Sequence, residues 1–458
     1  MTREPVAAKV RLRRRPVPVA PAVRVSGIRV KSLFGKLDYP IIPLENEGSS
    51  KSRVSVLYGD NGTGKTTILR LVYACLSPQT KSGLRTLLAS TPFLEFVVEL
   101  SDGTSIKTTK DQLVGNYKVL ISNKTSREEF EVEASPDGAV REQESVTRLE
   151  RAIRRLNFDV LFVDHNRVVK STYAFLSDIN STQHEYVIDV DYDDRRYFAH
   201  EASPRAVRRF KETDLRFPLP QVIDALESWF RGQAYRQGAA GDQSAAAVYL
   251  EIAKSLVRDR RRPSPASVSD IVDVVTTLQS LKETTRSFIS HGLLSDYPFD
   301  EFINIYETAS RPRKVQIESV LAPFLDSIQR RITALADVHK LITIFETEIN
   351  CYFRDKWVKF HILDGLSIGD ENGLVDPELL SSGEKQLVFL LCAAAVSRSK
   401  RSLILIDEPE LSLNYKWQRL IAGSLANISS GSDTQYILAS HSIEIITRYV
   451  DSSFELSN

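Results

Sequence analysis

Runs of hydrophobic residues along the chain predict β-strands of two kinds. Unbroken apolar runs at 54–58, 159–163, 402–406 and 436–439 are typical of strands that are buried on both faces, as in a parallel sheet. Shorter segments at 24–30, 39–44, 93–100, 105–108, 117–121 and 129–132 predict a second, antiparallel group. The turn at 101–104 contains Asp-Gly, which predicts a hairpin between its flanking segments. A helix is expected near 142–156.

Helical spacing dominates the middle of the chain, from about 171 to 350. Helices are expected at 222–230, 245–257 and 268–288, followed by a heptad-like seam. The seam consists of Phe324, Ile328, Ile332, Leu335, Val338, Ile342, Phe345 and Ile349. Because it spans fewer than about four heptads, it favours a helical hairpin or bundle packed on the core over a long projecting coil.

Composition and charge narrow the class of protein. The 458 residues include 60 Lys and Arg and 59 Asp and Glu, which gives a net charge of +1. This charge is too small to attract the protein as a whole to nucleic acid or to a membrane surface. Hydrophobic and charged fractions of 42% and 26% are those of a soluble globular protein. No run approaches the ~18 apolar residues of a membrane span, and the N-terminus has no apolar signal region. Cys75, Cys351 and Cys392 lack metal-ligand spacing, which predicts reduced thiols and a cytoplasmic location.

Three polar segments each leave two interpretations open. Residues 1–23 are rich in Pro and Arg and predict an extended arm, which either contacts nucleic acid or an acidic partner through Arg11, Arg13, Arg14 and Arg15 or is a solvated tail. The basic segment 258–263 is either a phosphate contact or a solvated turn. The acidic cluster Asp189, Asp191, Asp193 and Asp194 is either a metal site or a solvated loop.

A phosphate-binding loop follows the apolar run at 54–58. The residues that match G-x-x-x-x-G-K-[ST] are Gly59, Asp60, Asn61, Gly62, Thr63, Gly64, Lys65 and Thr66, with Thr67 behind them. Glycines let backbone N–H groups surround a phosphate, and the following helix start adds its positive dipole end. We expect Lys65 to reach the β- and γ-phosphates and the Thr66 hydroxyl to bind Mg²⁺. The sequence therefore predicts a site for a nucleoside triphosphate.

Two further apolar runs end in polar residues that complete such a site. Asp407 and Glu408 follow the run at 402–406, and we expect Asp407 to hold Mg²⁺ through water and Glu408 to act as general base toward the attacking water. His441 follows the run at 436–439 and is expected near the γ-phosphate. Asp164, at the end of the run at 159–163, opens a polar segment that is either a ligand contact or an ordinary strand-end loop.

A second helix start rich in small residues precedes the apolar helix at 387–393. It consists of Ser381, Ser382, Gly383 and Glu384. Such a start is an anion site, but the chain has only one triphosphate loop. A head-to-tail homodimer resolves this, because each copy would close its serine-rich segment over the nucleotide of the other.

In this order, the phosphate loop, an L-S-S-G-E-K-Q signature, a D-E-P segment and a switch histidine resemble an ABC-type ATPase of the soluble RecF/SMC/OLD-like branch. The resemblance covers about residues 24–167 and 353–458. Ser381 matches the signature serine, while Ser382 and Glu384 replace a glycine and a glutamine. Segment 410–414 resembles the D-loop, with Asn414 where this branch often has His, and no Q-loop glutamine stands out.

The resemblance implies an α/β fold: an ABC-type P-loop ATPase head, with a mixed sheet core and an antiparallel β-subdomain, carrying a large helical insertion. The expected units are the arm 1–23, ATPase lobes 24–170 and 353–458, and the insertion 171–352. ATP and Mg²⁺ are the implied ligands, and hydrolysis to ADP and phosphate is the implied activity.

For the biological role, the sequence is similar to stand-alone ATPase subunits of bacterial anti-phage systems, such as the Septu ATPase and the PARIS ATPase. This similarity implies a sensor or scaffold that controls a separate nuclease or toxin, because no TOPRIM or HNH cluster is recognised in the chain. The alternative is a RecF-like DNA-binding ATPase of repair or recombination. A transporter ATPase is disfavoured by the insertion and by the S-S-G-E signature.

Overall fold

The computed structural model describes residues 23–44, 53–78, 83–135, 138–141, 143–164, 169–171, 186–190, 197–201, 219–241, 274–399 and 402–457. Several segments discussed above lie outside these residues. They are the arginines of the N-terminal segment 1–23, residues 165–167, Asp191, Asp193 and Asp194, the predicted helix at 245–257 and the basic segment 258–263.

A mixed sheet forms the centre of the head, in the strand order β17-β3-β16-β15-β8-β9. The bounds are β3 Val54–Tyr58, β8 Asp159–Val163, β9 Val169–Ser171, β15 Ser402–Asp407, β16 Gln435–Ala439 and β17 Ser453–Glu455. β15 is parallel to both β8 and β16, and β16 and β17 are parallel to β3, whereas β9 is antiparallel to β8. The four apolar runs of the sequence are therefore neighbouring buried parallel strands, as predicted.

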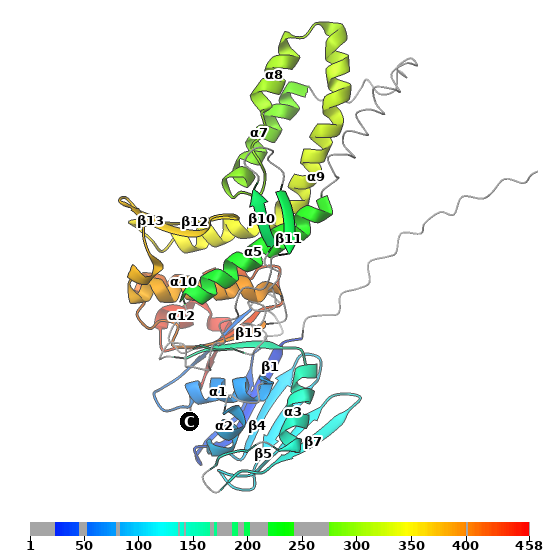
Figure 1. Cartoon of the computed structure of the whole chain (residues 1–458). Helices are drawn as coiled ribbons and strands as arrows, with labels where there is room; N and C mark the ends of the chain where they lie inside the picture. Colours follow the sequence, from blue (N-terminus) through cyan, green and yellow to red (C-terminus); the bar gives the residue numbers. More distant parts are fainter. Residues whose placement is uncertain are drawn as a thin grey trace, which may run out of the picture.

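The two faces of this sheet are covered by different helices (Figure 1). Leu403 and Leu405 of β15 belong to the core that contains helix α1, Lys65–Leu76. Ile404 and Ile406 point to the other side, into the core that contains α10, Ser382–Val396, and α11, Tyr415–Ile428. Because side chains alternate along a strand, α1 and α10 lie on opposite faces of one sheet.

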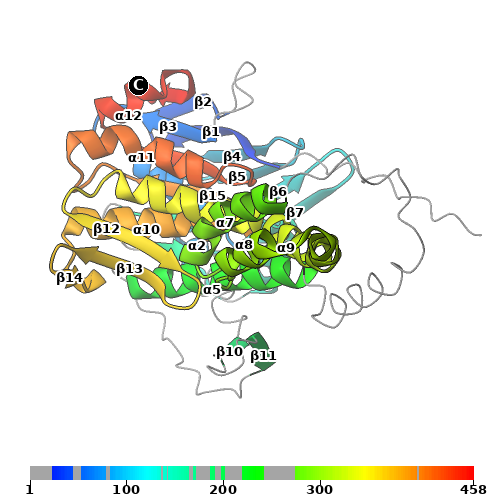
Figure 2. The ribbon, with the colours of Figure 1, turned by 90° about the horizontal axis from the view of Figure 1, so that it is seen from above.

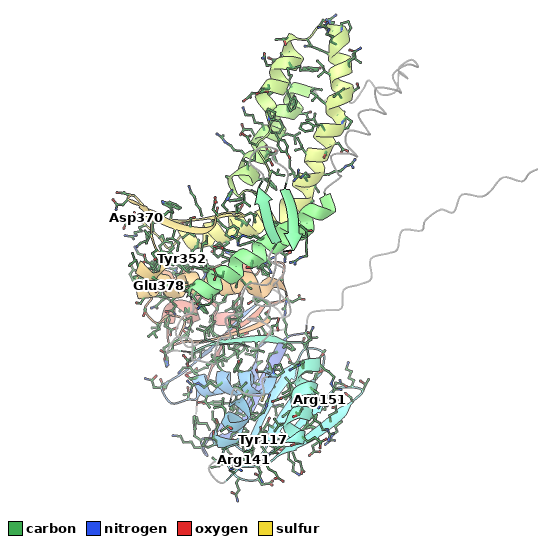
Figure 3. All side chains as sticks on the ribbon, viewed as in Figure 1. Tyr117, Arg141, Arg151, Tyr352, Asp370 and Glu378 are labelled. Atoms are coloured by element: carbon green, nitrogen blue, oxygen red, sulfur yellow. The ribbon has the colours of Figure 1, made fainter. Side chains whose placement is uncertain are left out.

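A second, antiparallel sheet has the order β2-β1-β4-β5-β6-β7. The bounds are β1 Val25–Leu33, β2 Leu37–Pro43, β4 Glu95–Leu100, β5 Ser105–Thr109, β6 Tyr117–Ser122 and β7 Arg127–Val132. Helices α2, Leu84–Ser90, and α3, Glu144–Arg155, accompany it, and the labelled Tyr117, Arg141 and Arg151 lie in this part of the molecule (Figure 3). The predicted antiparallel β-subdomain and its β4–β5 hairpin are confirmed.

One side chain joins the two sheets. Gln435 of β16 donates from Nε2 to the carbonyl of Val25 at 2.8 Å, and its Oε1 accepts from the Val25 N–H at 2.9 Å. Both residues are buried, with 4% and 0% of their surface exposed. The amide side chain thus takes the place of a backbone partner at the first residue of β1 and fixes the β-subdomain on the head.

Helices between the two halves of the head build a projection, which is a different segment from the N-terminal arm 1–23 and is called the arm from here on. Their bounds are α5 Leu219–Gly241, α7 Val274–Ser290, α8 Phe299–Thr308 and α9 Arg311–Asn350. Helices α7, α8 and the first part of α9 stand away from the head, while α5 lies across α10 (Figure 1); Figure 2 shows the arm from above. β10 Tyr186–Val190 and β11 Tyr197–Glu201 form an antiparallel strand pair that helical spacing did not predict.

The heptad-like seam lies on α9, which is one helix of 40 residues. All its members from Ile328 to Ile349 are buried, and Phe324 packs against the same core. The second part of α9 packs on the head, as predicted, through contacts with α5, α10 and α11. The first part instead belongs to the projecting arm, where it packs on α7 and contacts α8 through the Phe302–Phe324 ring pair and the Tyr306–Glu318 hydrogen bond.

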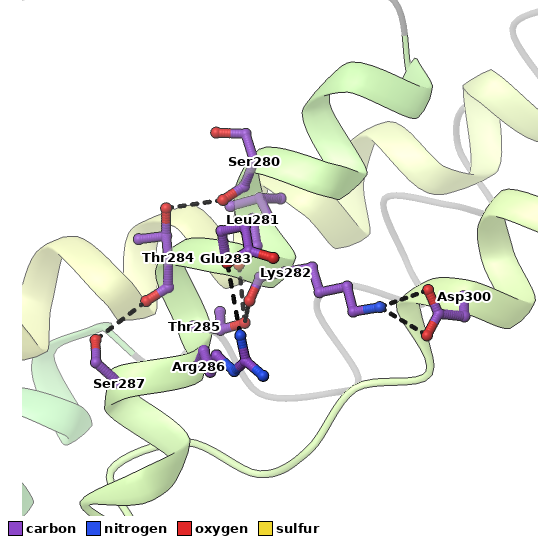
Figure 4. A network of polar contacts seen from close by, with 9 residues as sticks. All are labelled: Ser280, Leu281, Lys282, Glu283, Thr284, Thr285, Arg286, Ser287 and Asp300. Carbon is purple, nitrogen blue, oxygen red and sulfur yellow. Dashed lines mark hydrogen bonds and ion pairs between the residues drawn. The ribbon is translucent and has the colours of Figure 1, made fainter.

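Polar contacts tie α7 to α8 within the arm (Figure 4). The ammonium of Lys282 lies 2.7 Å from both carboxylate oxygens of Asp300. The Thr284 hydroxyl donates to the Ser280 carbonyl at 2.8 Å, which satisfies the hydroxyl within its own helix. No helix of the described residues is long and apolar enough to cross a membrane.

The remaining elements are short strands and a 3₁₀ turn before α10 and short helical segments that follow α10 and β16. They are β12 Lys356–His361, β13 Gly365–Asp370, β14 Gly373–Leu374, the short 3₁₀ turns Pro377–Leu379 and Ser397–Ser399, α12 Ile443–Arg448, and a turn at Val450–Ser452. The labelled Asp370, Tyr352 and Glu378 mark this layer in Figure 3. Tyr352, just beyond α9, donates to the Ser424 hydroxyl of α11 at 2.8 Å, which anchors the arm on the head.

Candidate nucleotide-binding site

The phosphate loop connects the end of β3 to α1 in a conformation that needs glycine. Gly59, Gly62 and Gly64 have φ angles of 149°, 88° and 88°, which residues other than glycine rarely adopt. A Cβ on Gly59 would lie 2.6 Å from the Leu456 carbonyl oxygen, and one on Gly64 would lie 2.6 Å from Cδ2 of Leu33. Backbone geometry therefore favours glycine at all three positions, and close packing favours it at Gly59 and Gly64 as well.

Lys65 turns its ammonium back over the loop. Its Nζ donates to the carbonyls of Gly59 at 2.8 Å and Asp60 at 2.9 Å. Burial lowers the pKa of Lys65, and the nearby carboxylates of Asp407 and Glu408 oppose this shift. The positive charge is thus already held at the centre of the loop, where a phosphate oxygen would compete with these carbonyls.

Two aromatic residues near the start of the chain lie beside the loop, Tyr39 in β2 and Phe34 in the turn after β1. The buried Tyr39 donates its hydroxyl to the Thr63 carbonyl at 2.8 Å. Phe34, which is 41% exposed, has Cε2 3.5 Å from the Cβ position of Gly64. The structure makes Tyr39 a core residue that also fixes the loop backbone, and it leaves Phe34 exposed beside the loop.

Thr66 and Asp407 meet at the carboxyl edge of the sheet. The Thr66 hydroxyl donates to Oδ1 of Asp407 at 2.9 Å, and Asp407 is 2% exposed. A hydroxyl beside a buried carboxylate is a set of hard oxygen donors that suits Mg²⁺. In the described part of the chain no group of three or more His, Cys, Asp or Glu could hold a metal. A Mg²⁺ bound together with a nucleotide takes few protein ligands and completes its shell with phosphate and water.

Glu408 follows Asp407 with a backbone conformation that is uncommon for its residue type. Its φ is 51°, and its N–H donates to the Ala439 carbonyl at 2.8 Å, so the neighbouring strand fixes this geometry. Such strained positions gather at functional sites, because surrounding structure must compensate for them. His441 lies just beyond the end of β16, which is the strand between β3 and β15. The His441 side chain is exposed.

The start of α10 is closed by a capping box. The Ser381 hydroxyl accepts from the Glu384 N–H at 3.4 Å, and Oε2 of Glu384 accepts from the Ser381 N–H at 2.8 Å. Oε1 of Glu384 accepts from Nζ of Lys356 at 2.8 Å. Burial alone would raise the pKa of Glu384, but the hydrogen bonds from Lys356 and Ser381 lower it. Both carboxylate oxygens of Glu384 are used inside the chain, whereas Ser381 and Ser382 are exposed.

The structure brings together the phosphate loop, Asp407, Glu408 and the end of β16 that carries His441. It does not bring Ser381 to them, because α10 and α1 cover opposite faces of the sheet. Asp164 lies at the end of β8, 3.8 Å from the Arg70 guanidinium. Asn414 is the N-cap of α11, and its Oδ1 accepts from the Trp417 N–H at 3.0 Å. Sequence reasoning missed the supporting Lys356 and Glu410; for Glu410, the signal was an acid directly after Pro409.

A comparison with protein families identifies the chain. The model of the family described as "AAA domain, putative AbiEii toxin, Type IV TA system" matches residues 54–447. The chain belongs to this family. The family assignment and the fold agree with the predicted P-loop ATPase with an inserted helical part, while the roles of the individual site residues stay predictions.

Solved structures with a similar arrangement include two heads of Smc proteins. One is the Smc head domain with an extended coiled coil bound to the C-terminal domain of ScpA, from Pyrococcus furiosus, at 12% identity and a TM-score of 0.36, covering 93% of this chain and 91% of that one. The other is an Smc head bound to the C-terminal winged-helix domain of ScpA, at 10% identity and a TM-score of 0.35, covering 92% and 91%. No curated protein is similar enough to match the chain.

Proposed function

We propose that the chain binds ATP with Mg²⁺ between two copies arranged head to tail and hydrolyses it to ADP and phosphate. The observation that carries the proposal is the position of the helix starts of α1 and α10 on opposite faces of one sheet. A chain that exposes Ser381 and Ser382 away from its own phosphate loop can use them on the loop of a second copy.

Each residue of the site has a separate task in this proposal. The loop backbone and Lys65 bind the β- and γ-phosphates, and Thr66 and Asp407 hold Mg²⁺, which neutralises phosphate charge when bound. Glu408 accepts a proton from the water that attacks the γ-phosphorus, and the bond from that phosphorus to the β,γ-bridging oxygen breaks to leave ADP. His441 contacts the γ-phosphate or the attacking water.

Exposed apolar side chains beside the same sequence features support a second copy as the partner. Leu379 precedes Ser381 and is 78% exposed, and Ile443 follows His441 and is 74% exposed. Leu411 lies in segment 410–414 and Tyr415 directly follows that segment, and these side chains are 38% and 65% exposed. Large apolar side chains gathered around polar site residues are typical of surfaces that another protein covers.

The finer part of the proposal is that this assembly controls a separate effector, a nuclease or toxin, in bacterial anti-phage defence. A physical route from the nucleotide to such a partner is available. The last residue of α9, Asn350, donates to the Val358 carbonyl at 2.7 Å and accepts from its N–H at 2.8 Å, and Lys356 of the same strand contacts Glu384. The arm and the serine-rich helix start are thus connected through β12.

The test of ATP hydrolysis uses Glu408→Gln. Loss of the general base should lower hydrolysis by about 100-fold or more, while ATP binding is kept and the dimer is trapped. Glu444→Gln, a partly exposed acid on α12, is the matched control and should behave like wild type. Unchanged hydrolysis by Glu408→Gln would refute the assignment of Glu408.

The test of the biological role is co-purification with the product of the adjacent open reading frame, with and without ATP. A nuclease or toxin that stays bound in ATP supports effector control. ATP-dependent and salt-sensitive binding to DNA, without such a partner, would instead support the RecF-like alternative.

A further inference from the structure

Glu410 lies in the segment after β15, and its carboxylate contacts the segment after β16. Oε2 accepts from the Ser440 hydroxyl at 2.9 Å. Oε1 accepts from the backbone N–H groups of His441 at 2.6 Å and Ser442 at 3.1 Å. A single largely buried side chain thus receives three hydrogen bonds from consecutive residues around His441.

We propose that Glu410 is a positioning residue for hydrolysis, which fixes the backbone of His441 against the segment that carries Glu408. The inference rests on the proposed function. The His441 side chain is exposed, so the backbone sets much of its direction. Glu408 is two peptide units before Glu410 and is itself fixed by the Ala439 carbonyl at 2.8 Å. Displacement of a catalytic group by about 1 Å can lower a rate by about 100-fold.

The hydrogen-bond pattern explains why an acid is suited to this position. The Ser440 hydroxyl oxygen already accepts from the Ser442 N–H at 3.0 Å, so its own proton is available to donate to Glu410. All three contacts therefore require an acceptor, and an ionised carboxylate has only acceptors. Burial raises the pKa of Glu410, while the donors from His441 and Ser440 oppose this shift and favour the charged form.

The surrounding segment is stiff enough for the clamp to matter. The Ser442 hydroxyl donates to Oε1 of Gln418 at 2.8 Å, and Nε2 of Gln418 donates to the Leu413 carbonyl at 2.8 Å. Gln386 of α10 donates to the Pro409 carbonyl at 3.2 Å. The residues before and after Glu410 are therefore anchored independently, and loss of its carboxylate should release mainly the His441 segment.

The test measures ATP hydrolysis, ATP affinity and thermal unfolding of the full chain with Glu410→Ala, Glu410→Asp and Glu410→Gln. Glu410→Ala removes all three acceptors, and Glu410→Asp withdraws the carboxylate by one methylene, so both should lower kcat by about tenfold or more with ATP affinity nearly unchanged. Glu410→Gln keeps an acceptor for the two N–H groups and should retain activity within about threefold of wild type. Glu444→Ala is the control for loss of a nearby acid.

A double-mutant cycle separates positioning from a general structural role. If Glu410 acts through His441, Glu410→Ala should cost no more than about threefold in the His441→Ala background, although it costs about tenfold or more alone. Multiplicative losses would overturn the proposal. Should Glu410→Ala fail to fold, Glu410→Asp takes its place in the cycle, and equal activity of the Asp and Gln variants would also overturn it. A wild-type protein without ATPase activity would refute the proposed function as well, whereas an active wild type with an equally active Glu410→Ala refutes only the positioning role.

Discussion

The Thr66 hydroxyl donates a hydrogen bond to the Asp407 carboxylate at 2.9 Å, across 341 positions of the sequence. The contact joins the first turn of α1 to the end of β15, two elements that pack against each other in the core. It places a neutral and an anionic oxygen donor side by side at the carboxyl edge of the sheet. The pair is therefore ready to share one hard cation with the phosphates of a nucleotide.

Removal of the Thr66 hydroxyl or of the Asp407 charge should raise the Mg²⁺ concentration that ATP hydrolysis requires. Thr66→Val keeps the branched shape but removes the hydroxyl, and Asp407→Asn keeps the shape but removes the charge. We expect each to lower kcat/KM by about 100-fold, or roughly 2.7 kcal/mol, at low Mg²⁺. Hydrolysis titrated with Mg²⁺ measures the change, and Thr147→Val, at an exposed position of α3, is the control for loss of a threonine hydroxyl. A Thr66→Val protein with the Mg²⁺ dependence of wild type would refute the assignment.

The phosphate loop allows a prediction about space rather than charge. Gly59 and Gly62 both have positive φ, but only a Cβ on Gly59 would meet backbone, 2.6 Å from the Leu456 carbonyl oxygen, whereas nothing lies within 4 Å of that on Gly62. Alanine at either position costs about 1–2 kcal/mol for the left-handed backbone. Gly59→Ala should lower the unfolding temperature and the ATP affinity further, because β17 must move away. Equal effects of the two substitutions would contradict this account.

Local motifs and buried runs made part of the site predictable. The loop from Gly59 to Thr66 is a contiguous pattern, and Asp407 and His441 end apolar runs that can only be buried strands, so their common edge follows from parallel pairing. The hairpin at 101–104 is encoded by its Asp-Gly turn. These features depend on neighbours in sequence, which is why sequence alone finds them.

Contacts between distant residues could not be predicted in the same way. Neither Tyr39 on the Thr63 carbonyl nor Gln435 on Val25 has a local signal, because each depends on how the two sheets pack. The contact of Glu384 with Lys356, 28 positions earlier, likewise has no local signal, whereas its capping contact with Ser381 is local. The arm was underestimated because the seam on α9 does not reveal that two other helices contact its first part.

Lys110, which lies outside the candidate site, makes the stability of the folded chain depend on pH. Its buried ammonium donates to the carbonyls of Thr91 at 2.6 Å, Ala89 at 3.1 Å and Leu113 at 3.2 Å, and it lies 4.0 Å from the centre of the Phe93 ring. Burial lowers the pKa of Lys110 from 10.5 to about 7. Between these two values the unfolded chain binds more protons than the folded chain, so the free energy of unfolding rises with pH, by up to about 1.4 kcal/mol per unit.

The variant Lys110→Met removes this dependence. The difference in unfolding free energy between wild type and Lys110→Met should shift by about 2 kcal/mol in favour of wild type from pH 6.5 to pH 8.5. Urea unfolding at both pH values measures it. Lys107→Met, at a partly exposed lysine of β5 that pairs with Glu95, controls for the loss of a positive charge. A difference that stays constant over this range, or changes in the opposite direction, would contradict a lowered pKa.

The exposed apolar residues around the site allow dimerisation to be separated from ATP binding. Ile443 and Leu379 are 74% and 78% exposed beside His441 and Ser381, so a second copy that covers these polar residues must also bury them. We expect Ile443→Asp and Leu379→Asp each to weaken the ATP-bound dimer of the Glu408→Gln protein by about tenfold or more, because a charge replaces buried apolar contact. Binding of ATP to the monomer should be unchanged. Ile305→Asp on α8, 54% exposed in the arm, is the matched control. Sedimentation at several protein concentrations measures the dimer, and a dimer of undiminished affinity in both variants would show that another surface joins the copies.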